Sequence, residues 1–398
     1  MKRLGVPCMH PYQIHLLIFM ILTAVVCLLT MVNLVSMPTL YISWPEKLHN
    51  YFGTQSHTSL GAIQFLETIS ESEKHGLNET KVILLWCPVF GGGTFLKEGK
   101  NSFANSGCPE NRCEITSDRS RLLESHAVLF HIRTLSLLDV PHNRTITQKW
   151  IFFTLESPPY SEFSGFSFMF GMFNWTMSYR NDSDIVIRYG SIKPNAKNAF
   201  NLSHLYLNWR EKTKIAVWMV SHCSTVGNRE KYVEQLQNYI DIDTYGFCGK
   251  AVCDFNKTNI CLENFSKKYF FYLAFENTIC EDYITEKFYR VLHYDMIPVV
   301  FGGGNYLAVA PAGSYINALD FDSPKKLSSH LYRVASNFTL FSNYFKWKVR
   351  GYDIRDYAMD CDLCEKLHSH SFLENSVYYD INKWWIKDAN CRSWKEVK

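Results

Sequence analysis

Residues 269–304 read YFFYLAFENTICEDYITEKFYRVLHYDMIPVVFGGG, in which two apolar runs flank a more polar segment. The runs at 269–275 and 297–301 have the continuous apolar character of strands that are buried on both faces of a sheet. Between them, Asp282 can cap a helix. The order strand, loop, helix, strand predicts a parallel α/β unit that ends in the glycines at 302–304. In open α/β sheets, ligands bind at the carboxyl ends of such strands.

The helix predicted within this stretch has one polar and one apolar face. Its polar residues recur at the helical spacing and so share one side: Tyr283, Glu286, Lys287 and Arg290. Its apolar residues recur on another side: Ile284, Phe288 and Val291. A polar face near the start of a helix, beside strand ends and a glycine turn, predicts a site for a phosphorylated ligand.

A second unit of this kind lies upstream, with a predicted strand at 214–220 and a predicted helix at 229–240. The apolar side of this helix consists of Tyr232, Val233, Leu236, Tyr239 and Ile240. Arg229 lies in its first turn, as Lys287 does in the other helix. Because both helices follow strands of one parallel sheet, we expect the two cations to meet at its carboxyl edge around a diphosphate. Two separate, solvated surface cations are the alternative.

An earlier α/β domain is predicted from alternating apolar runs and turn-rich segments. Its strands are expected at 82–86, 127–131 and 150–155, with a helical segment at 119–125. In the second domain, a further strand is expected at 314–319 and a further helix at 324–335. Glu156 follows the third of these strands. A carboxylate at a strand end that faces a cleft suits a general base, whereas a turn glutamate that caps the following Ser-Pro loop is the alternative.

Several motifs at fixed spacing connect these units. They are FYLAFEN, DYITEK and PVVFGG within 271–303, FNWTMSYR with DSD within 173–184, and FTLESP at 153–158. Over residues 82–364 the chain resembles the α1,3-fucosyltransferases, glycosyltransferase family 10, which are inverting Golgi enzymes. The resemblance implies the GT-B fold, an α/β architecture of two Rossmann-like domains that face a cleft. It also implies GDP-β-L-fucose as the donor and a GlcNAc residue of a glycoprotein or glycolipid glycan as the acceptor.

The resemblance also implies roles for individual residues. It makes Glu156 the catalytic base. It makes the following residues donor contacts: Arg229, Lys287, Glu286, Tyr283, Asn277, Tyr179, Ser221, His222 and Tyr272. It places Arg133, Glu156 and Tyr179 on the acceptor side. Family members often have asparagine where this chain has His222, which is a departure from the pattern.

The acceptor is the least determined part of this prediction. Arg133 lies in a tract where, in Lewis-type enzymes, arginine accompanies α1,3 linkage to GlcNAc of a type 2 chain. The loop at 90–95 lacks a glutamine that is often found there in such enzymes. Transfer to the innermost GlcNAc of an N-glycan therefore stays open. Another nucleotide sugar as the donor is also an open alternative. From different classes of protein, the alternatives are an inactive lectin-like relative and a structural membrane glycoprotein.

Two D-x-D sequences, at 182–184 and 241–243, have the form of a manganese motif. Such sequences are frequent by chance, and the predicted cation pair already serves the phosphates. We therefore expect structural roles for both and no essential metal, with stimulation by Mn²⁺ left open.

The chain has 398 residues and a formal net charge of +3, and its Lys and Arg residues are not clustered, which argues against a nucleic-acid partner. An uncharged apolar run follows a short N-terminus that carries Lys2 and Arg3, which predicts a signal anchor rather than a cleaved signal peptide. The predicted parts are a cytoplasmic tail (1–13), a transmembrane anchor (14–37), a stem (38–80), an acceptor-side domain (81–210), a GDP-fucose-binding domain (211–360) and a disulfide-linked tail (361–398). We expect a single-pass type II protein of the Golgi membrane, and a homodimer stays open.

Cysteines and sequons agree with a lumenal location. Of 13 cysteines, Cys8 and Cys27 precede or lie within the anchor, so 11 remain and at least one is unpaired. Disulfides are favoured over zinc for the close pairs Cys108/Cys113 and Cys361/Cys364, and the family resemblance implies links between the first domain and the tail. The N-glycosylation candidates are Asn78, Asn143, Asn201, Asn256 and Asn337; three more sequons begin at Asn174, Asn181 and Asn264.

Overall fold

The structure, a computed structural model, describes residues 79–88, 96–162, 165–195, 200–249, 253, 258–355 and 357–396. All of these belong to one compact unit, Ile69–Lys398. The predicted cytoplasmic tail, anchor, most of the stem, and the loop at 90–95 lie outside the described residues. Within the described ranges, no helix combines the length and the apolar character needed to cross a membrane.

The first lobe is built on a parallel sheet with the strand order β2-β1-β3-β4-β5-β6. Its strands are β1 (Lys81–Leu85), β2 (Cys113–Thr116), β3 (Ala127–His131), β4 (Lys149–Phe153), β5 (Trp175–Ser178) and β6 (Ile185–Val186). Every residue of β1, β3 and β4 is buried, because the sheet is covered on both faces. Strand β4 ends at Phe153, so Glu156 lies in the loop after it and not at the strand end itself.

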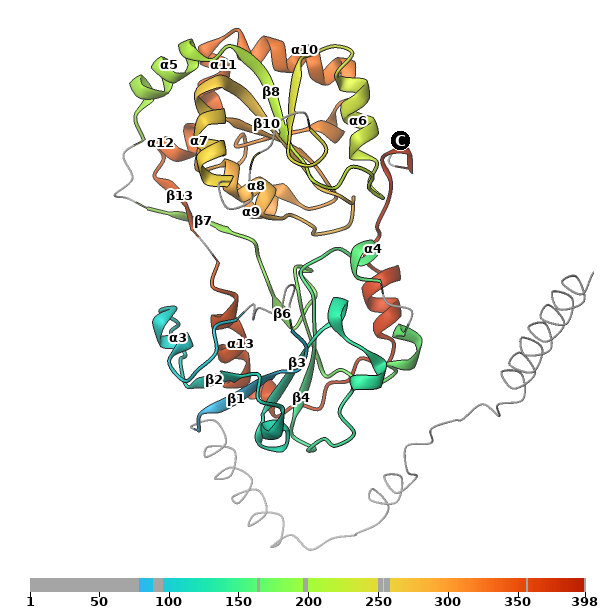
Figure 1. The fold of residues 1–398 in the computed structure, drawn as a ribbon. Coiled ribbons are helices and arrows are strands. Elements are labelled where there is room, and N and C mark those ends of the chain that lie inside the picture. Colours follow the sequence, from blue (N-terminus) through green and yellow to red (C-terminus); the bar gives the residue numbers. More distant parts are fainter. Residues whose placement is uncertain are drawn as a thin grey trace, which may run out of the picture. The chain divides into compact units, whose positions relative to one another are not determined.

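The second lobe contains a parallel sheet with the order β12-β11-β10-β8-β9. Its strands are β8 (Lys214–Met219), β9 (Ile242–Tyr245), β10 (Tyr269–Phe275), β11 (Ile297–Phe301) and β12 (Ile316–Asn317). Helices α6 (Arg229–Leu236) and α10 (Pro324–Ala335) pack on one face, and α7 (Thr258–Lys268) and α8 (Glu286–Val291) pack on the other. Figure 1 shows these helices around the strands of this lobe. The α/β class with two parallel sheets is therefore confirmed.

Side chains of each central strand alternate between two apolar cores. In β8, Ala216 and Trp218 join the core under α6 and α10, and Val217 joins the core under α7 and α8. The period of two is the ordinary consequence of a pleated strand. An antiparallel pair, β7 (Ser191–Pro194) with β13 (Tyr352–Arg355), lies where the chain passes between the two sheets.

The chain returns to the first lobe after β13. Helix α13 (Met359–Leu367) packs on one face of the first sheet, and the π-helical turn η10 (Lys383–Lys387) packs on the other. Figure 1 shows this red C-terminal segment beside the blue and green strands of the first lobe. The first sheet is therefore covered on both faces by residues about 200 positions away in sequence, as the link from Lys149 to Glu374 illustrates.

The remaining elements are short or peripheral. The other α-helices are α3 (Ser102–Asn105), α4 (Pro158–Ser161), α5 (Leu202–Glu211), α9 (Tyr306–Val309), α11 (Phe338–Asn343) and α12 (Lys346–Val349). The 3₁₀ turns are η3 (Arg119–Glu124), η4 (Ile132–Thr134), η5 (Leu137–Asp139), η6 (Phe166–Phe168), η8 (Ala318–Asp320), η9 (His370–Phe372) and η11 (Trp394–Glu396). The helix predicted at 324–335 has the bounds of α10, and the strand predicted at 314–319 shortens to β12.

Two local predictions are wrong. Helix α8 begins at Glu286 with Thr285 at its N-cap, so Asp282 does not cap it. Asp282 instead has a left-handed backbone (φ 62°), and its carboxylate accepts hydrogen bonds from the backbone and the side chain of Asn181 at 3.0 and 2.7 Å. Helix α6 ends at Leu236, before the predicted end at residue 240. Tyr239 therefore lies beyond the end of the helix, and it is 45% exposed.

Five disulfides join the described cysteines. They are Cys108–Cys361, Cys113–Cys364, Cys223–Cys248, Cys253–Cys261 and Cys280–Cys391. The first two cross-link the first lobe to α13, as the resemblance implied. Cys87 is buried and free, and burial raises the pKa of its thiol to about 12.

The sequons fall into three groups. Asn143, Asn181, Asn201, Asn264 and Asn337 are exposed, and Asn201 and Asn337 cap α5 and α11. Asn78 and Asn256 lie outside the described residues. The Asn174 amide is engaged on both sides, because it donates to the Ser376 carbonyl at 2.9 Å and accepts from the Trp150 backbone at 2.9 Å.

Candidate active site

A cavity of about 590 Å³ lies between residues of the two lobes. The first lobe contributes Arg133, Glu156 and Tyr160. The second contributes the predicted donor residues Ser221, His222, Arg229, Tyr272, Asn277, Glu286 and Lys287, together with residues after β8 and β9. Except for Tyr272, which lies within β10, the named residues of the second lobe follow strands or begin helices, and the parallel sheet brings them to a common edge.

Lys287 is held at this edge by a buried polar cluster. Its ammonium group donates to the Glu276 carboxylate at 3.1 Å and to the Thr285 hydroxyl at 2.8 Å. Glu276 is fully buried and also accepts from the Thr285 backbone and hydroxyl at 2.8 and 2.9 Å. Glu286 lies 3.4 Å from the same ammonium group. These contacts fix the Lys287 charge at the start of α8.

The charge state of this cluster follows from its contacts. Burial lowers the pKa of Lys287, but the negative charges of Glu276 and Glu286 outweigh burial, so its net pKa is raised. Burial raises the pKa of Glu276, and the Lys287 charge and the Thr285 hydrogen bonds oppose that change. Burial likewise raises the pKa of Glu286, but Lys287 and Arg290 reverse the shift, so its net pKa is lowered. Lys287 is therefore a cation at neutral pH.

Arg229 is the second cation of the cavity and is only 4% exposed. Its guanidinium donates to the carbonyls of Phe275 at 2.6 Å and His222 at 3.3 Å. Among the described residues, none forms an ion pair with Arg229, and its buried Nε has no hydrogen-bond partner. Burial lowers the pKa of Arg229, with Glu276 opposing the change. A buried guanidinium with an unused donor beside a cavity suits an anionic ligand.

Glu156 faces this pair from the first lobe. Its carboxylate lies 3.6 Å from the Arg133 guanidinium, and the two side chains are 34% and 30% exposed. The neighbouring Tyr160 contacts the second lobe, because its hydroxyl accepts from the Val226 backbone at 3.2 Å and its ring lies 5.0 Å from that of His222. The carboxylate and the two cations thus line one cavity from different lobes.

Tyr179 and Tyr283 are the two predicted site residues that do not line the cavity. Both are buried, and their ring centroids lie 4.7 Å apart in a core shared by the two lobes. Tyr283 precedes α8 instead of lying on its polar face, because the helix starts three residues later. The buried Tyr179 hydroxyl has no hydrogen-bond partner among the described residues.

Three of the four D-x-D carboxylates make hydrogen bonds within the protein, and the fourth, Asp241, is exposed and does not line the cavity. Asp182 pairs with Arg180 at 2.6 Å, and Asp184 accepts from the Thr176 backbone at 2.9 Å. Asp243 accepts from Lys214 at 2.6 Å. None of the three lines the cavity.

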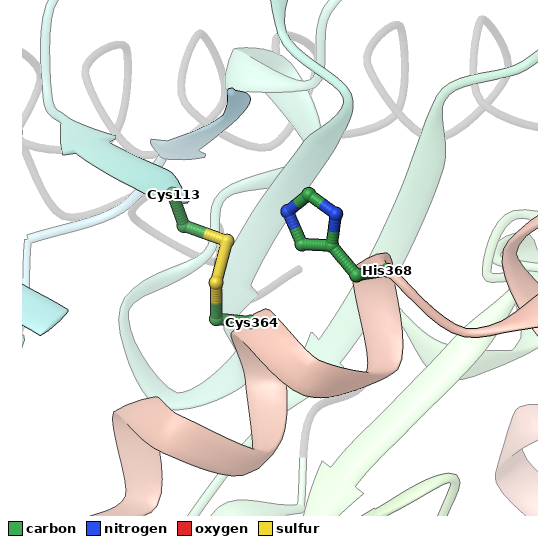
Figure 2. A group of neighbouring side chains, drawn as sticks. All are labelled: Cys113, Cys364 and His368. Carbon is green, nitrogen blue, oxygen red and sulfur yellow. A yellow bond between two sulfur atoms is a disulfide. The ribbon is translucent and has the colours of Figure 1, made fainter. Parts of the chain in front are cut away.

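The zinc alternative for the cysteine pairs is wrong. Figure 2 shows the sulfurs of Cys113 and Cys364 joined in a disulfide, with the His368 ring beside them. Thiolates bind metals, whereas the sulfurs of this disulfide are bonded to each other. The group therefore has the spacing of a metal site without the chemistry of one.

Two residues of the site were missed from the sequence. Glu276 follows β10 within FEN, and a carboxylate directly after a buried strand was the available signal. Tyr160 comes after two prolines in a short helix, and nothing in its neighbourhood indicates that it reaches the other lobe.

Comparison with known proteins identifies chains that are similar to this one over most of its residues. Residues 78–190 match the model described as fucosyltransferase, N-terminal, and residues 209–384 match that of glycosyltransferase family 10 (fucosyltransferase), C-terminal. Alpha-(1,3)-fucosyltransferase C of Drosophila melanogaster is 35% identical, with 80% of each chain covered. Glycoprotein 3-alpha-L-fucosyltransferase A of the same species is 33% identical over 80% of this chain and 63% of its own. The 4-galactosyl-N-acetylglucosaminide 3-alpha-L-fucosyltransferase 9 of Rattus norvegicus is 34% identical over 77% and 82%.

Proposed function

The chain belongs to glycosyltransferase family 10, the fucosyltransferases, and from this premise we propose that it moves L-fucose from GDP-β-L-fucose to a GlcNAc residue of a glycan, in α1,3 linkage and with inversion. One observation carries the donor part of this proposal. The buried Arg229 has an unused donor and no ion-pair partner among the described residues, and it lines the same cavity as Lys287. A diphosphate offers the negative charge that Arg229 lacks, within reach of the Lys287 cation of the same cavity.

The reaction requires one displacement. Glu156 removes the proton from the acceptor hydroxyl, and the hydroxyl oxygen forms a bond to C1 of fucose while the bond from C1 to the β-phosphate oxygen breaks. Arg229 and Lys287 stabilise the negative charge that grows on the departing GDP. The proton stays on Glu156 until the products leave, after which water removes it.

We extend the proposal to the absence of an essential metal. The support is that two cations line the cavity, and that three of the four D-x-D carboxylates bond to other parts of the protein. Transfer should persist in excess EDTA. A loss of activity that Mn²⁺ restores would overturn this part alone.

The acceptor is proposed to be GlcNAc of a type 2 chain on a glycoprotein or glycolipid. Arg133 supports this assignment, since it lies beside Glu156 on the acceptor side of the cavity. The innermost GlcNAc of an N-glycan is the second candidate, because relatives whose names specify different acceptors are about equally similar to this chain. A panel of N-acetyllactosamine, LacdiNAc and N-glycan core acceptors, with linkage analysis of the products, separates these outcomes.

We also propose that the protein is a type II protein of the Golgi membrane with a lumenal catalytic part. The apolar run at 14–37 and the five disulfides support this location. Expression of the full chain with an epitope at each end, followed by protease protection of intact vesicles, tests the orientation.

The decisive experiment on the site replaces Glu156 with glutamine. General-base catalysis contributes roughly 10²- to 10⁴-fold, so kcat should fall by that factor while the Kd for GDP stays unchanged. Glu162→Gln is the matched control, because Glu162 is an exposed carboxylate six residues further along the chain. Loss of GDP binding in Glu156→Gln, or wild-type turnover, would remove Glu156 from the role of base.

A further inference from the structure

Tyr189 occupies the point where the chain leaves the first lobe, between β6 and β7. It packs against the apolar cores of both lobes. The next residue, Gly190, lies so close to α8 that an added Cβ would come within 2.6 Å of the Tyr289 ring. The backbone at 189–190 therefore packs directly against α8, the helix that begins with Glu286 and Lys287.

The Tyr189 hydroxyl donates a short hydrogen bond to the carbonyl of Leu155, the residue before Glu156. This contact joins the chain crossing to the loop that carries the proposed base. A hydrogen bond to a backbone carbonyl fixes the peptide plane, and the plane at Leu155 sets the direction in which the Glu156 side chain leaves the backbone.

Other contacts hold the ends of this loop. The Thr154 backbone donates to Met177 at 3.2 Å, and the Ser157 carbonyl accepts from the Tyr160 backbone at 2.9 Å. The side-chain hydroxyls of Thr154 and Ser157 are buried and have no hydrogen-bond partner among the described residues. The hydroxyls of the loop itself therefore do not anchor it, and Tyr189 supplies the contact in the middle.

The surroundings of the Tyr189 hydroxyl keep it a donor. Burial raises the pKa of Tyr189 well above its ordinary value of 10.0, and the negative charges of Glu286 and Glu156 raise it further. A neutral phenol can donate to the Leu155 carbonyl throughout the neutral range, whereas a phenolate could not.

We propose that Tyr189 is a positioning residue: its hydroxyl holds the Leu155 carbonyl and so aims the Glu156 carboxylate at the acceptor hydroxyl. Because Gly190 rests on α8, this contact also sets the base relative to the helix that carries the leaving-group cation Lys287. The inference rests on the proposed function, in which Glu156 is the general base.

The test is Tyr189→Phe, which removes the hydroxyl and keeps the ring. Displacement of a catalytic group by about 1 Å can cost 10²-fold, so we expect kcat to fall roughly 10- to 100-fold. The KM for GDP-fucose, the Kd for GDP and the Tm should stay close to wild type, because the donor cations and the packing of the ring are unchanged. Wild-type kcat, or a parallel loss of GDP affinity and Tm, would overturn the inference.

Tyr357→Phe is the matched control. The Tyr357 hydroxyl also donates to a backbone carbonyl in this region, but to that of Val186 at 2.8 Å instead of that of Leu155. Its kcat should equal that of wild type. An equal loss of kcat in both variants would show that any such hydrogen bond matters, and would overturn the specific role of Tyr189.

A double variant separates this inference from the proposed function. If Tyr189 acts through Glu156, then Tyr189→Phe should cause no further loss of the residual rate in a Glu156→Gln background. Losses that multiply would overturn the positioning role. Normal turnover in Glu156→Gln would reject the base and the inference together, whereas an inactive Glu156→Gln with a fully active Tyr189→Phe would reject the inference alone.

Discussion

The two lobes present their parts of the cavity in different ways. On the donor side, Lys287 and Arg229 sit at helix starts and are fixed by buried partners such as Glu276, which has no exposed surface. On the acceptor side, Glu156 and Arg133 lie outside the strands and about one third of each side chain is exposed. The difference teaches that the proposed diphosphate site is built into the fold, whereas the proposed acceptor site depends on loops and their supports.

The lobes also differ in how they are held together. The second lobe covers its own sheet with α6, α7, α8 and α10. The first lobe takes part of the cover on each face of its sheet from the C-terminal segment, and two disulfides join that segment to it. These two disulfides join segments far apart in sequence, whereas the two within the second lobe, Cys223–Cys248 and Cys253–Cys261, span sequence separations of only 25 and 8.

The largest effect is expected from removing both of these disulfides. Cys108–Cys361 and Cys113–Cys364 span sequence separations of 253 and 251, and either one closes nearly the same loop. Replacing the two cysteines of one disulfide with alanine should change the free energy of unfolding little. Replacing all four should lower it by about 5 kcal/mol, because the unfolded chain gains the entropy of the opened loop. Urea unfolding followed by fluorescence measures this. Equal and additive losses from the two disulfides would contradict the idea that they share one loop.

The next effect is expected at Glu276 in the second lobe. Glu276→Gln removes the charge opposite Lys287, and breaking a buried ion pair in this way costs about 3–5 kcal/mol. The Kd for GDP should rise as well, since Lys287 loses its main support. Glu263→Gln is the control, because the Glu263–Lys267 pair is exposed and of little consequence for stability. If both variants unfold at the same urea concentration, the buried cluster is not what stabilises the donor edge.

The smallest of the three is a pH effect in the first lobe. Burial, and then the positive charge of Arg133, lower the pKa of His131 from 6.5 to about 4. The unfolded chain therefore takes up this proton first as the pH falls. The contribution of neutral His131 to the free energy of unfolding is therefore fully present above pH 6.5 and is lost as the pH falls towards 4. The loss is about 1.4 kcal/mol for each pH unit and reaches about 3 kcal/mol.

The measurement is the free energy of unfolding at pH 7.0, 5.5 and 4.5. The slope should be flatter in His131→Asn than in wild type, and unchanged in His370→Asn, which alters an exposed histidine. Identical slopes in all three proteins would mean that His131 has the same pKa in the folded and the unfolded chain, and would contradict this prediction.

The sequence predicted those parts of the molecule that depend on local patterns. The bounds of β3 and α10 agree with their apolar runs and caps, and the convergence of Arg229 and Lys287 follows from the geometry of a parallel sheet. Asp282 was misread because its left-handed backbone places its carboxylate on a partner from the other lobe. A residue type that commonly caps helices gives no sign of such a distant partner.

The remaining errors and omissions have the same origin. Tyr179 and Tyr283 meet across the two lobes, and Tyr189 reaches a carbonyl 34 positions away. The C-terminal cover of the first sheet depends on apolar residues whose partners lie about 200 positions earlier. No periodicity within a window of the sequence contains this information, because it arises only when the lobes pack.

The end of the described chain touches the second lobe as well. Cys391 is bonded to Cys280, and the Trp394 ring packs 5.0 Å from that of Tyr232 on α6. A purification tag fused there, or a chain cut short before residue 391, would disturb the helix that begins with Arg229. Recombinant production of the enzyme is therefore better served by a tag placed ahead of residue 79.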